Sequence, residues 1–195
     1  MNIAYDYQTF TVQKYGGISR YFYQLTKHIS KTENAAEIFS PLHINNYINN
    51  LPKELVNGRF VDANYIDRIP KKSRIIGSIN RSLSKRKIDL FNPDIVHETF
   101  YSKHKTYKKS KCTVITVYDM IHELFDYYLP PHRKGWDEKK DAINRADHII
   151  CISEHTRKDL VELFGIEKEK TSVVHLAYDN SVIVDDKLVN ERPFL

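Results

Sequence analysis

Three polar side chains that follow a strongly apolar segment have the spacing needed to act on one substrate. Asp119, His122 and Glu123 lie three and four residues apart, so on a helix they would share one face. An imidazole between two carboxylates can move protons or hold a metal ion. The metalloprotease pattern H-E-x-x-H is not met, because Asp126 stands four residues after His122. A helix-capping Asp119 beside a solvated ion pair is the simpler local interpretation, and no metal site is predicted.

A pair of glycines, Gly16 and Gly17, precedes a segment with helical spacing. Glycine lets the backbone approach a ligand closely, and the amino end of a helix offers free N–H groups and a positive dipole to a phosphate. A tight turn that requires positive φ is the simpler local explanation. The dinucleotide fingerprint G-x-G-x-x-G is absent, because Ile18 follows Gly17, which argues against an NAD- or FAD-dependent enzyme. No cofactor is therefore predicted.

Two basic regions suggest an anionic partner. The stretch 103–111 contains five lysines with aromatic residues between them, which is typical of a surface for nucleic acid or lipid phosphate but also of a solvated loop between buried strands. A helix predicted over Ser73 to Arg86 has basic residues near its ends and could lie on an anionic membrane or pack its apolar face on a sheet. That face would carry Ile75, Ile76, Ile79 and Leu83.

Short apolar segments that alternate with helices must position all of these residues. Strands are predicted over Asn2 to Tyr7, Glu37 to Ser40, Ile95 to Thr99, Thr113 to Tyr118, His148 to Ile152 and Thr171 to Leu176. Helices are predicted over Ile18 to Ser30, Ser73 to Arg86, Lys134 to Ala146 and Ser153 to Phe164, the last ended by Gly165. The alternation predicts a Rossmann-like, doubly wound α/β fold with a parallel sheet, which binds ligands at the carboxyl ends of its strands. The stretch from Pro41 to Arg68 has no readable pattern.

The composition is that of a globular protein. The 195 residues are 41% hydrophobic and 28% charged, with a formal net charge of +5, a mild basic bias that selects no partner by itself. Cys112 and Cys151 lie in apolar segments, so buried reduced thiols are predicted. With no apolar run of membrane-spanning length and no secretion-like leader, a cytoplasmic location is predicted.

Five motifs, taken in order, resemble the amino-terminal domain of the GT-B glycosyltransferases of family 4 (group 1), a retaining group. The resemblance extends from Asn2 to Leu195. The motifs are Y-G-G-I-S-R-Y-F (Tyr15 to Phe22), P-D-I-V-H (Pro93 to His97), T-V-Y-D-M-I-H-E-L-F (Thr116 to Phe125), A-D-H-I-I-C-I-S-E-H-T (Ala146 to Thr156) and S-V-V-H (Ser172 to His175).

The resemblance implies two Rossmann-like domains that face a cleft, one half of which this chain would supply. Residues 1–180 would form the acceptor-side domain, and residues 181–195 would begin a linker to a carboxyl-terminal domain that grips the nucleotide-sugar. The parent enzyme would transfer a hexose, with mannose favoured by the D-M-I-H-E motif, to a polysaccharide or lipid-linked glycan in cell-surface polysaccharide biosynthesis. It would act in the cytoplasm at the inner face of the membrane, with peripheral membrane contact and without nucleic acid. The isolated chain would be inactive.

The resemblance also implies roles for individual residues. Gly16 and Gly17 would approach the donor diphosphate. Tyr118 stands where the family commonly has a histidine that contacts the transferred sugar; a phenol with an ordinary pKa of about 10 cannot replace imidazole in proton transfer near neutrality, but it can donate a hydrogen bond. Tyr118, Asp119, His122 and Glu123 form the implied catalytic group. The implied acceptor or cleft-lining residues are Arg20, His97, Glu98, Ser153 and Glu154.

A function of a different class is the alternative. The chain could be a stand-alone basic module that binds a membrane surface or nucleic acid through the lysines between Lys103 and Lys111. Binding that falls steeply with salt would distinguish this module from a transferase domain.

Overall fold

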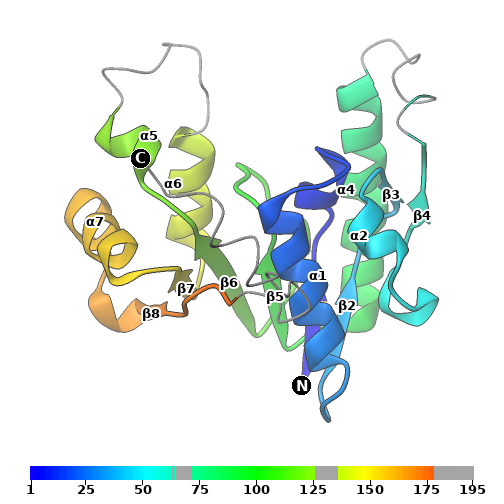
Figure 1. Ribbon diagram of the computed structural model, residues 1–195, viewed down its shortest axis with the longest axis horizontal. Coiled ribbons are helices and arrows are strands. Elements are labelled where there is room, and N and C mark those ends of the chain that lie inside the picture. Colours follow the sequence, from blue (N-terminus) through cyan, green and yellow to red (C-terminus); the bar gives the residue numbers. More distant parts are fainter. Residues whose placement is uncertain (63, 65–71, 126–135, 178–195) are drawn as a thin grey trace, which may run out of the picture.

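A six-stranded parallel sheet organises the chain, in the order β2-β1-β5-β6-β7-β8 (Figure 1). The computed structural model describes residues 1–62, 64, 72–125 and 136–177. The strands are β1 (Asn2–Tyr5), β2 (Ala35–Ile38), β5 (Ile95–Glu98), β6 (Cys112–Val117), β7 (His148–Cys151) and β8 (Thr171–Val173). Every neighbouring pair is parallel. The predicted Rossmann-like α/β fold is confirmed.

Helices cover both faces of the sheet because successive residues of a strand point to opposite sides. On β1, the Tyr5 side chain packs with Phe22 of α1 (Gly17–Ile29), whereas the neighbouring Ala4 belongs to a cluster that includes Ile88 of α4 (Lys72–Phe91). Two further helices, α6 (Trp136–Arg145) and α7 (Glu154–Phe164), share a core with residues of β6 and β7. Because β6 is covered in this way, five of its six residues are buried.

Helix α7 has the predicted capping residue at each end. The Ser153 hydroxyl accepts a hydrogen bond from the Thr156 backbone N–H at 3.1 Å, which satisfies a donor that the helix leaves free. Gly165 ends the helix with φ of 63°, in the left-handed region that glycine adopts most easily. The two local signals therefore set the helix limits.

Helix α4 differs from its prediction in length and in orientation. It continues to Phe91, and its sheet-facing side holds Asn80, Ser84 and Ile88, all of which are fully buried. Of the two alternatives for this helix, the one in which its apolar face packs on the sheet is wrong, because most of that face is exposed to solvent. The exposed fractions are 48% for Ile75, 37% for Ile79 and 45% for Leu83.

The segment without a readable pattern forms a small second sheet beside the main one. Its parallel strands are β3 (Leu42–His43) and β4 (Arg59–Phe60), connected through α2 (Asn46–Asn49) and a 3-10 turn (Lys53–Leu55). Gly58 is required there, since a Cβ at this position would come within 1.7 Å of the Ser40 carbonyl oxygen. Strands of two residues are too short to show a hydrophobic periodicity in the sequence.

Several strand limits are shorter than predicted. β1 ends at Tyr5, before a 3-10 turn at Gln8–Thr11, and β8 ends at Val173 rather than Leu176. The predicted linker 181–195 and the predicted start of α6 at Lys134 lie outside the described residues. Among the helices of the described part, none is long and apolar enough to cross a membrane.

A polar pocket at the carboxyl edge of the sheet

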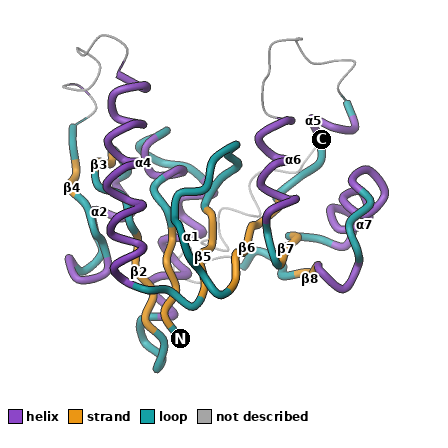
Figure 2. The backbone as a smooth tube through the Cα atoms, turned by 180° about the vertical axis from the view of Figure 1, so that it is seen from behind, coloured by secondary structure: helices purple, strands orange, loops and turns teal. Residues whose placement is uncertain are grey.

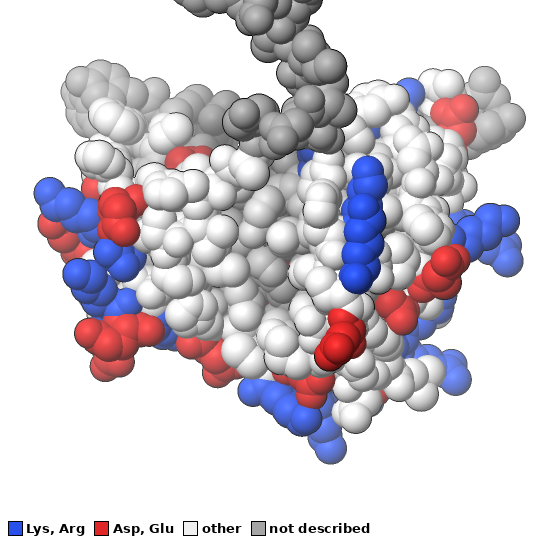
Figure 3. All heavy atoms as spheres, turned by 60° about the horizontal axis from the view of Figure 1, so that its bottom comes forward, with Lys and Arg blue, Asp and Glu red and all other residues white. Residues whose placement is uncertain are grey.

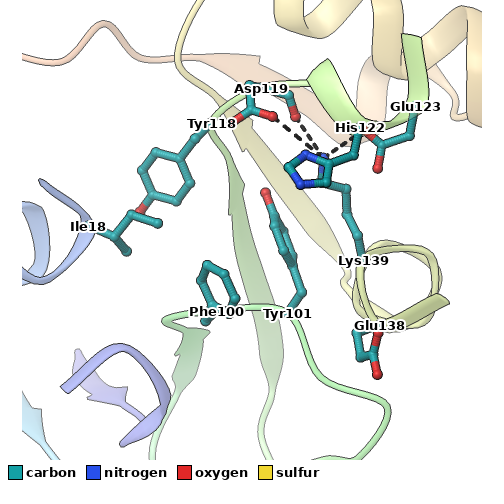
Figure 4. Close-up of a pocket in the computed structure, with 9 residues that line it drawn as sticks. All are labelled: Ile18, Phe100, Tyr101, Tyr118, Asp119, His122, Glu123, Glu138 and Lys139. Atoms are coloured by element: carbon teal, nitrogen blue, oxygen red, sulfur yellow. Dashed lines mark hydrogen bonds and ion pairs between the residues drawn. The ribbon is translucent and has the colours of Figure 1, made fainter. Parts of the chain in front are cut away.

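A cavity of about 260 Å³ lies where β5 and β6 end, between the start of α1 on one side and α5 (Ile121–Leu124) and α6 on the other (Figure 4). Parallel strands direct their carboxyl ends to the same edge, so residues far apart in the sequence meet here. The cavity is lined by Ile18, Phe100, Tyr101, Tyr118, Asp119, His122, Glu123, Glu138 and Lys139. Thus all four members of the predicted catalytic group, Tyr118, Asp119, His122 and Glu123, border one cavity.

Tyr118 directly follows β6 and extends its ring toward Ile18 at the start of α1 (Figure 4). Its ring meets that of Tyr21 edge-on, with centroids 6.1 Å apart. Burial, assisted by Tyr21 and Tyr101, raises the pKa of Tyr118 well above its ordinary value. The phenol therefore stays protonated near neutrality and can act on a ligand only through its hydrogen bond.

A buried lysine connects two of the acidic residues that line the pocket, Asp119 and Glu123. The Lys139 ammonium donates to the Glu123 carboxylate and to the Asp119 carbonyl oxygen, at 2.8 Å each, and its nitrogen lies 4.0 Å from the Asp119 carboxylate (Figure 4). The same nitrogen lies 5.3 Å from the centre of the Tyr101 ring. These contacts offset the loss of hydration of the Lys139 ammonium, since this residue is only 4% exposed. Lys139 thereby holds α5 at the end of β6.

Lys139 was not among the predicted site residues, although its position in the sequence indicates that it lies on the buried face of a helix. Within α6 it lies on the same face as Ala142 and Ile143, three and four residues later, and both of these are fully buried. A lysine on the buried face of a helix requires a partner. Phe100 and Tyr101, which follow β5 and add aromatic surface to the pocket, were also missed. Their positions after a strand end were the only available indication.

Two carboxylate oxygens at the pocket have no hydrogen-bond partner among the described residues. They are Oε1 of Glu123 and Oε2 of Glu138, and both are buried. The hydroxyl of Tyr118 is likewise buried and lacks a partner of normal geometry in the described part of the chain. Buried polar atoms are nearly always hydrogen-bonded, so unsatisfied atoms at a cavity favour a ligand that supplies the missing groups. Carboxylate oxygens accept from O–H and N–H donors, as in a polyhydroxylated ligand.

The glycine pair begins α1 beside this pocket. Gly16 caps the helix with an extended backbone (φ −172°), and the only described glycine with positive φ is Gly165. The tight-turn explanation is therefore wrong. A Cβ on Gly17 would meet no atom within 4 Å, so open space borders the helix start. The Arg20 N–H donates to the Gly16 carbonyl oxygen at 2.9 Å, and the N–H groups before it have no acceptor within a helix that begins here.

His97 and Glu98 lie below the pocket rather than in its lining. The His97 ring contacts Phe22, and its Nε2 lies 2.9 Å from the Thr116 hydroxyl; burial lowers the pKa of His97 to about 3. The Glu98 carboxylate receives hydrogen bonds from Arg145 at 2.6 and 2.9 Å, while burial raises the pKa of Glu98 to about 7 against the opposing effect of that guanidinium. As consecutive residues of β5, they point to opposite faces of the sheet, where His97 packs against α1 and Glu98 bonds to α6, so neither lines the cavity.

Arg20, Ser153 and Glu154 also lie outside the lining of the cavity. Arg20 is exposed in the first turn of α1. Ser153 caps α7, and Glu154 pairs with Arg157 of the same helix. All three are near strand ends or helix starts at this edge, yet only the group from Tyr118 to Glu123 and the start of α1 reach the cavity.

Three of the five lysines in the run between β5 and β6 have acidic or aromatic partners nearby. Lys103 pairs with Asp137, Lys111 pairs with Asp94, and the ammonium of Lys105 lies 5.5 Å from the centre of the Tyr107 ring. On the face turned forward in Figure 3, basic and acidic side chains stand next to one another along the periphery. This arrangement matches a solvated loop between buried strands better than a continuous anion-binding patch.

Comparisons with known proteins agree with the fold. A crystal structure of a glycosyltransferase from Rickettsia africae ESF-5 superimposes with a TM-score of 0.51 at 17% sequence identity, covering 97% of this chain and 48% of that chain. The chain thus spans about half the length of that protein. No curated protein matches the sequence. The sequence profile of Glycosyltransferase Family 4 matches residues 15–182. Since this match covers most of the chain and the fold agrees, the chain belongs to Glycosyltransferase Family 4.

Proposed function

We propose that this chain is the amino-terminal, acceptor-side domain of a retaining glycosyltransferase. The enzyme transfers a hexose, with mannose favoured, from a nucleotide-sugar to a polysaccharide or lipid-linked glycan. The family match supports glycosyl transfer, and the unsatisfied oxygens at the pocket carry the assignment of the site. A second domain supplies the other wall of the cleft in this proposal, consistent with a chain that spans about half of its structural relative.

The pocket suits a ligand with several hydroxyl groups. Glu123 Oε1 and Glu138 Oε2 need hydrogen-bond donors, which sugar hydroxyls supply. The Tyr118 phenol, which stays protonated, offers a donor to a sugar oxygen, and Phe100 and Tyr101 provide apolar surface beside it. Lys139 positions the Glu123 carboxylate through the other oxygen, and Oε1 is left without a hydrogen-bond partner among the described residues.

The start of α1 suits the diphosphate of the donor. Helix α1 has 13 residues, and its amino end presents free N–H groups and the positive end of the helix dipole. A side chain at Gly17 would project into the space that a phosphate needs. Ile18 connects this helix end with the sugar-binding pocket, because its side chain is part of the lining.

In the proposed reaction the acceptor oxygen forms a bond to the anomeric carbon as the bond from that carbon to the diphosphate oxygen breaks. Attack occurs on the same face that the leaving group departs from, which retains the anomeric configuration. The acceptor proton passes to the leaving diphosphate. Residues of this chain orient the sugar hydroxyls and stabilise the developing charge on the diphosphate, which is the main requirement of such a mechanism.

Transfer assays on the enzyme that contains this domain and its second domain test the proposal. Nucleotide-hexoses are offered one at a time with a lipid-linked acceptor, and the anomeric configuration of the product is read by NMR. Transfer with retention supports the proposal, whereas an inverted product or the absence of transfer from every nucleotide-hexose would refute it. The 195-residue chain by itself should bind nucleotide-sugar weakly in calorimetry, since the proposed donor grip lies in the second domain.

A further inference from the structure

Helix α4 presents polar residues to the protein and apolar residues to solvent. Toward the sheet side, the Asn80 side chain bonds the Leu42 backbone twice, at 2.7 Å through Oδ1 and 2.9 Å through Nδ2. The Ser84 hydroxyl donates to the Phe39 carbonyl oxygen at 2.9 Å. These bonds fix the rotation of α4 about its axis. The rotation leaves an outer stripe, defined as Ile75, Ile79, Leu83 and Leu90, exposed to solvent.

The outer stripe is continuous rather than scattered. Its first three members are spaced by four residues, so they stand above one another on a helix. Single exposed apolar residues are ordinary on protein surfaces, but a contiguous exposed stripe marks an interaction surface. In the view from behind, α4 runs along the outside of the molecule (Figure 2). The stripe is therefore open to a partner in the described part of the chain.

The charged residues of α4 are mostly basic, which favours an anionic partner. The helix contains six Lys and Arg residues and one acidic residue, Asp89. The carboxylate of Asp89 accepts the Lys108 backbone N–H at 2.8 Å. Arg86 falls between Leu83 and Leu90 on the stripe by helical periodicity, and Lys87 flanks it; both are exposed and neither has an ion-pair partner among the described residues. An apolar stripe with cations in and beside it complements the headgroup and acyl boundary of an anionic bilayer.

We propose that α4 docks this protein on the surface of an anionic phospholipid membrane through the outer stripe. The apolar side chains enter the headgroup boundary, while Arg86 and Lys87 reach the lipid phosphates. Through Ile88, α4 packs with Ala4 of β1 and Val96 of β5, whereas α5 and α6 lie on the opposite side of β6 in the view of Figure 1. Docking through the stripe therefore leaves the pocket open. This inference does not depend on the identity of the transferred sugar.

Vesicle co-sedimentation of the 195-residue protein tests the proposal. Phosphatidylglycerol-containing vesicles should bind the protein, pure phosphatidylcholine vesicles should bind it much less, and binding should fall as salt rises. Leu83→Gln should weaken binding about fivefold, because roughly half of that side chain enters the membrane. Lys87→Gln should weaken it by a similar factor of about five. The matched control is Leu163→Gln on α7, where the leucine is 47% exposed, and it should bind like the parent.

Three results would overturn the proposal. The first is a parent protein that does not bind phosphatidylglycerol vesicles, and the second is equal weakening by Leu83→Gln and Leu163→Gln. The third is self-association of the parent in analytical ultracentrifugation that Leu83→Gln abolishes while vesicle binding stays unchanged, because the stripe would then bind a second copy. Thermal melting of each variant shows that it is folded, and exposed positions should leave the melting temperature close to that of the parent.

Discussion

Lys139 and Glu123 form a buried ion pair in the pocket wall, with the ammonium nitrogen 2.8 Å from Oε2 of the carboxylate. The two side chains are only 6% and 1% exposed. A pair so deeply buried contributes little net stability against an apolar replacement, yet it is costly to break from one side. It also leaves Oε1 of Glu123 buried and without a hydrogen-bond partner among the described residues. Under the proposed function, the pair therefore positions the carboxylate that would bind the substrate.

Breaking this pair from one side should destabilise the protein strongly. Lys139→Met and Glu123→Gln should each lower the free energy of unfolding by about 3–5 kcal/mol, because each leaves an uncompensated buried charge. The double variant should lose clearly less than the sum of the two. Urea unfolding measures all three. The control is the exposed pair Lys158 and Glu162, 3.9 Å apart, where Lys158→Met should change stability by less than about 0.5 kcal/mol; additive losses at the buried pair would contradict the positioning role.

Substitution of Gly17 separates binding from folding. Gly17→Val in the proposed two-domain enzyme should lower kcat/KM by at least about tenfold, because the side chain enters the space proposed for the diphosphate. Its thermal stability should hardly change, since a Cβ there meets no atom within 4 Å. Gly77→Ala, at another glycine with open space, should keep full activity and gain about 1 kcal/mol of stability in the interior of α4. Full activity of a folded Gly17→Val enzyme would remove the phosphate role.

The ranking of three pocket variants tests the role of the phenol. Tyr118→Phe should cost less than about tenfold in kcat/KM, because a phenol whose pKa is raised by burial contributes only a hydrogen bond. His122→Ala and Glu123→Gln should cost more, since both change groups that line the pocket proposed for the sugar. Steady-state kinetics of the two-domain enzyme gives the ranking. A larger loss for Tyr118→Phe than for His122→Ala would mean that the phenol takes over the role of the family histidine.

Acidification should destabilise the protein through His97. Burial lowers the pKa of His97 from 6.5 to about 3 in the folded protein, so between these values the unfolded state binds the proton and stability falls as pH decreases. From pH 7 to pH 5 this effect is worth about 2 kcal/mol. Urea unfolding of His97→Phe should therefore show a pH dependence smaller than that of the parent by about this amount.

The exposed His104 provides the control for this measurement. His104→Gln should keep the pH dependence of the parent, because the His104 side chain is exposed rather than buried in the core. Groups that act in the opposite direction, such as Glu98 with its pKa raised to about 7, are present in all three proteins and cancel in the comparison. Equal pH dependence of the parent and His97→Phe would contradict the prediction, because protonation of the buried ring would then not lower the free energy of unfolding.

The order of strands and helices, and the place of the pocket-lining polar group along the chain, can be predicted from the residues. Strand and helix periods are local properties, so the order of elements, the cap at Ser153 and the glycine stop at Gly165 could be predicted from the residues alone. The polar group from Tyr118 to Glu123 could be predicted as well, because it follows a buried strand in a parallel sheet.

Only the tertiary structure decided which polar residues share the pocket. His97 and His122 look alike in the sequence, but one points into the core and the other lines the cavity. Lys139 meets Glu123 because α6 packs beside the end of β6, a contact that no local pattern encodes. The outward stripe of α4 has the same origin: two side chains of α4, at Asn80 and Ser84, bond to distant backbone and set the rotation of the helix. Periodicity defines the faces of an element, while long-range packing decides which face is buried.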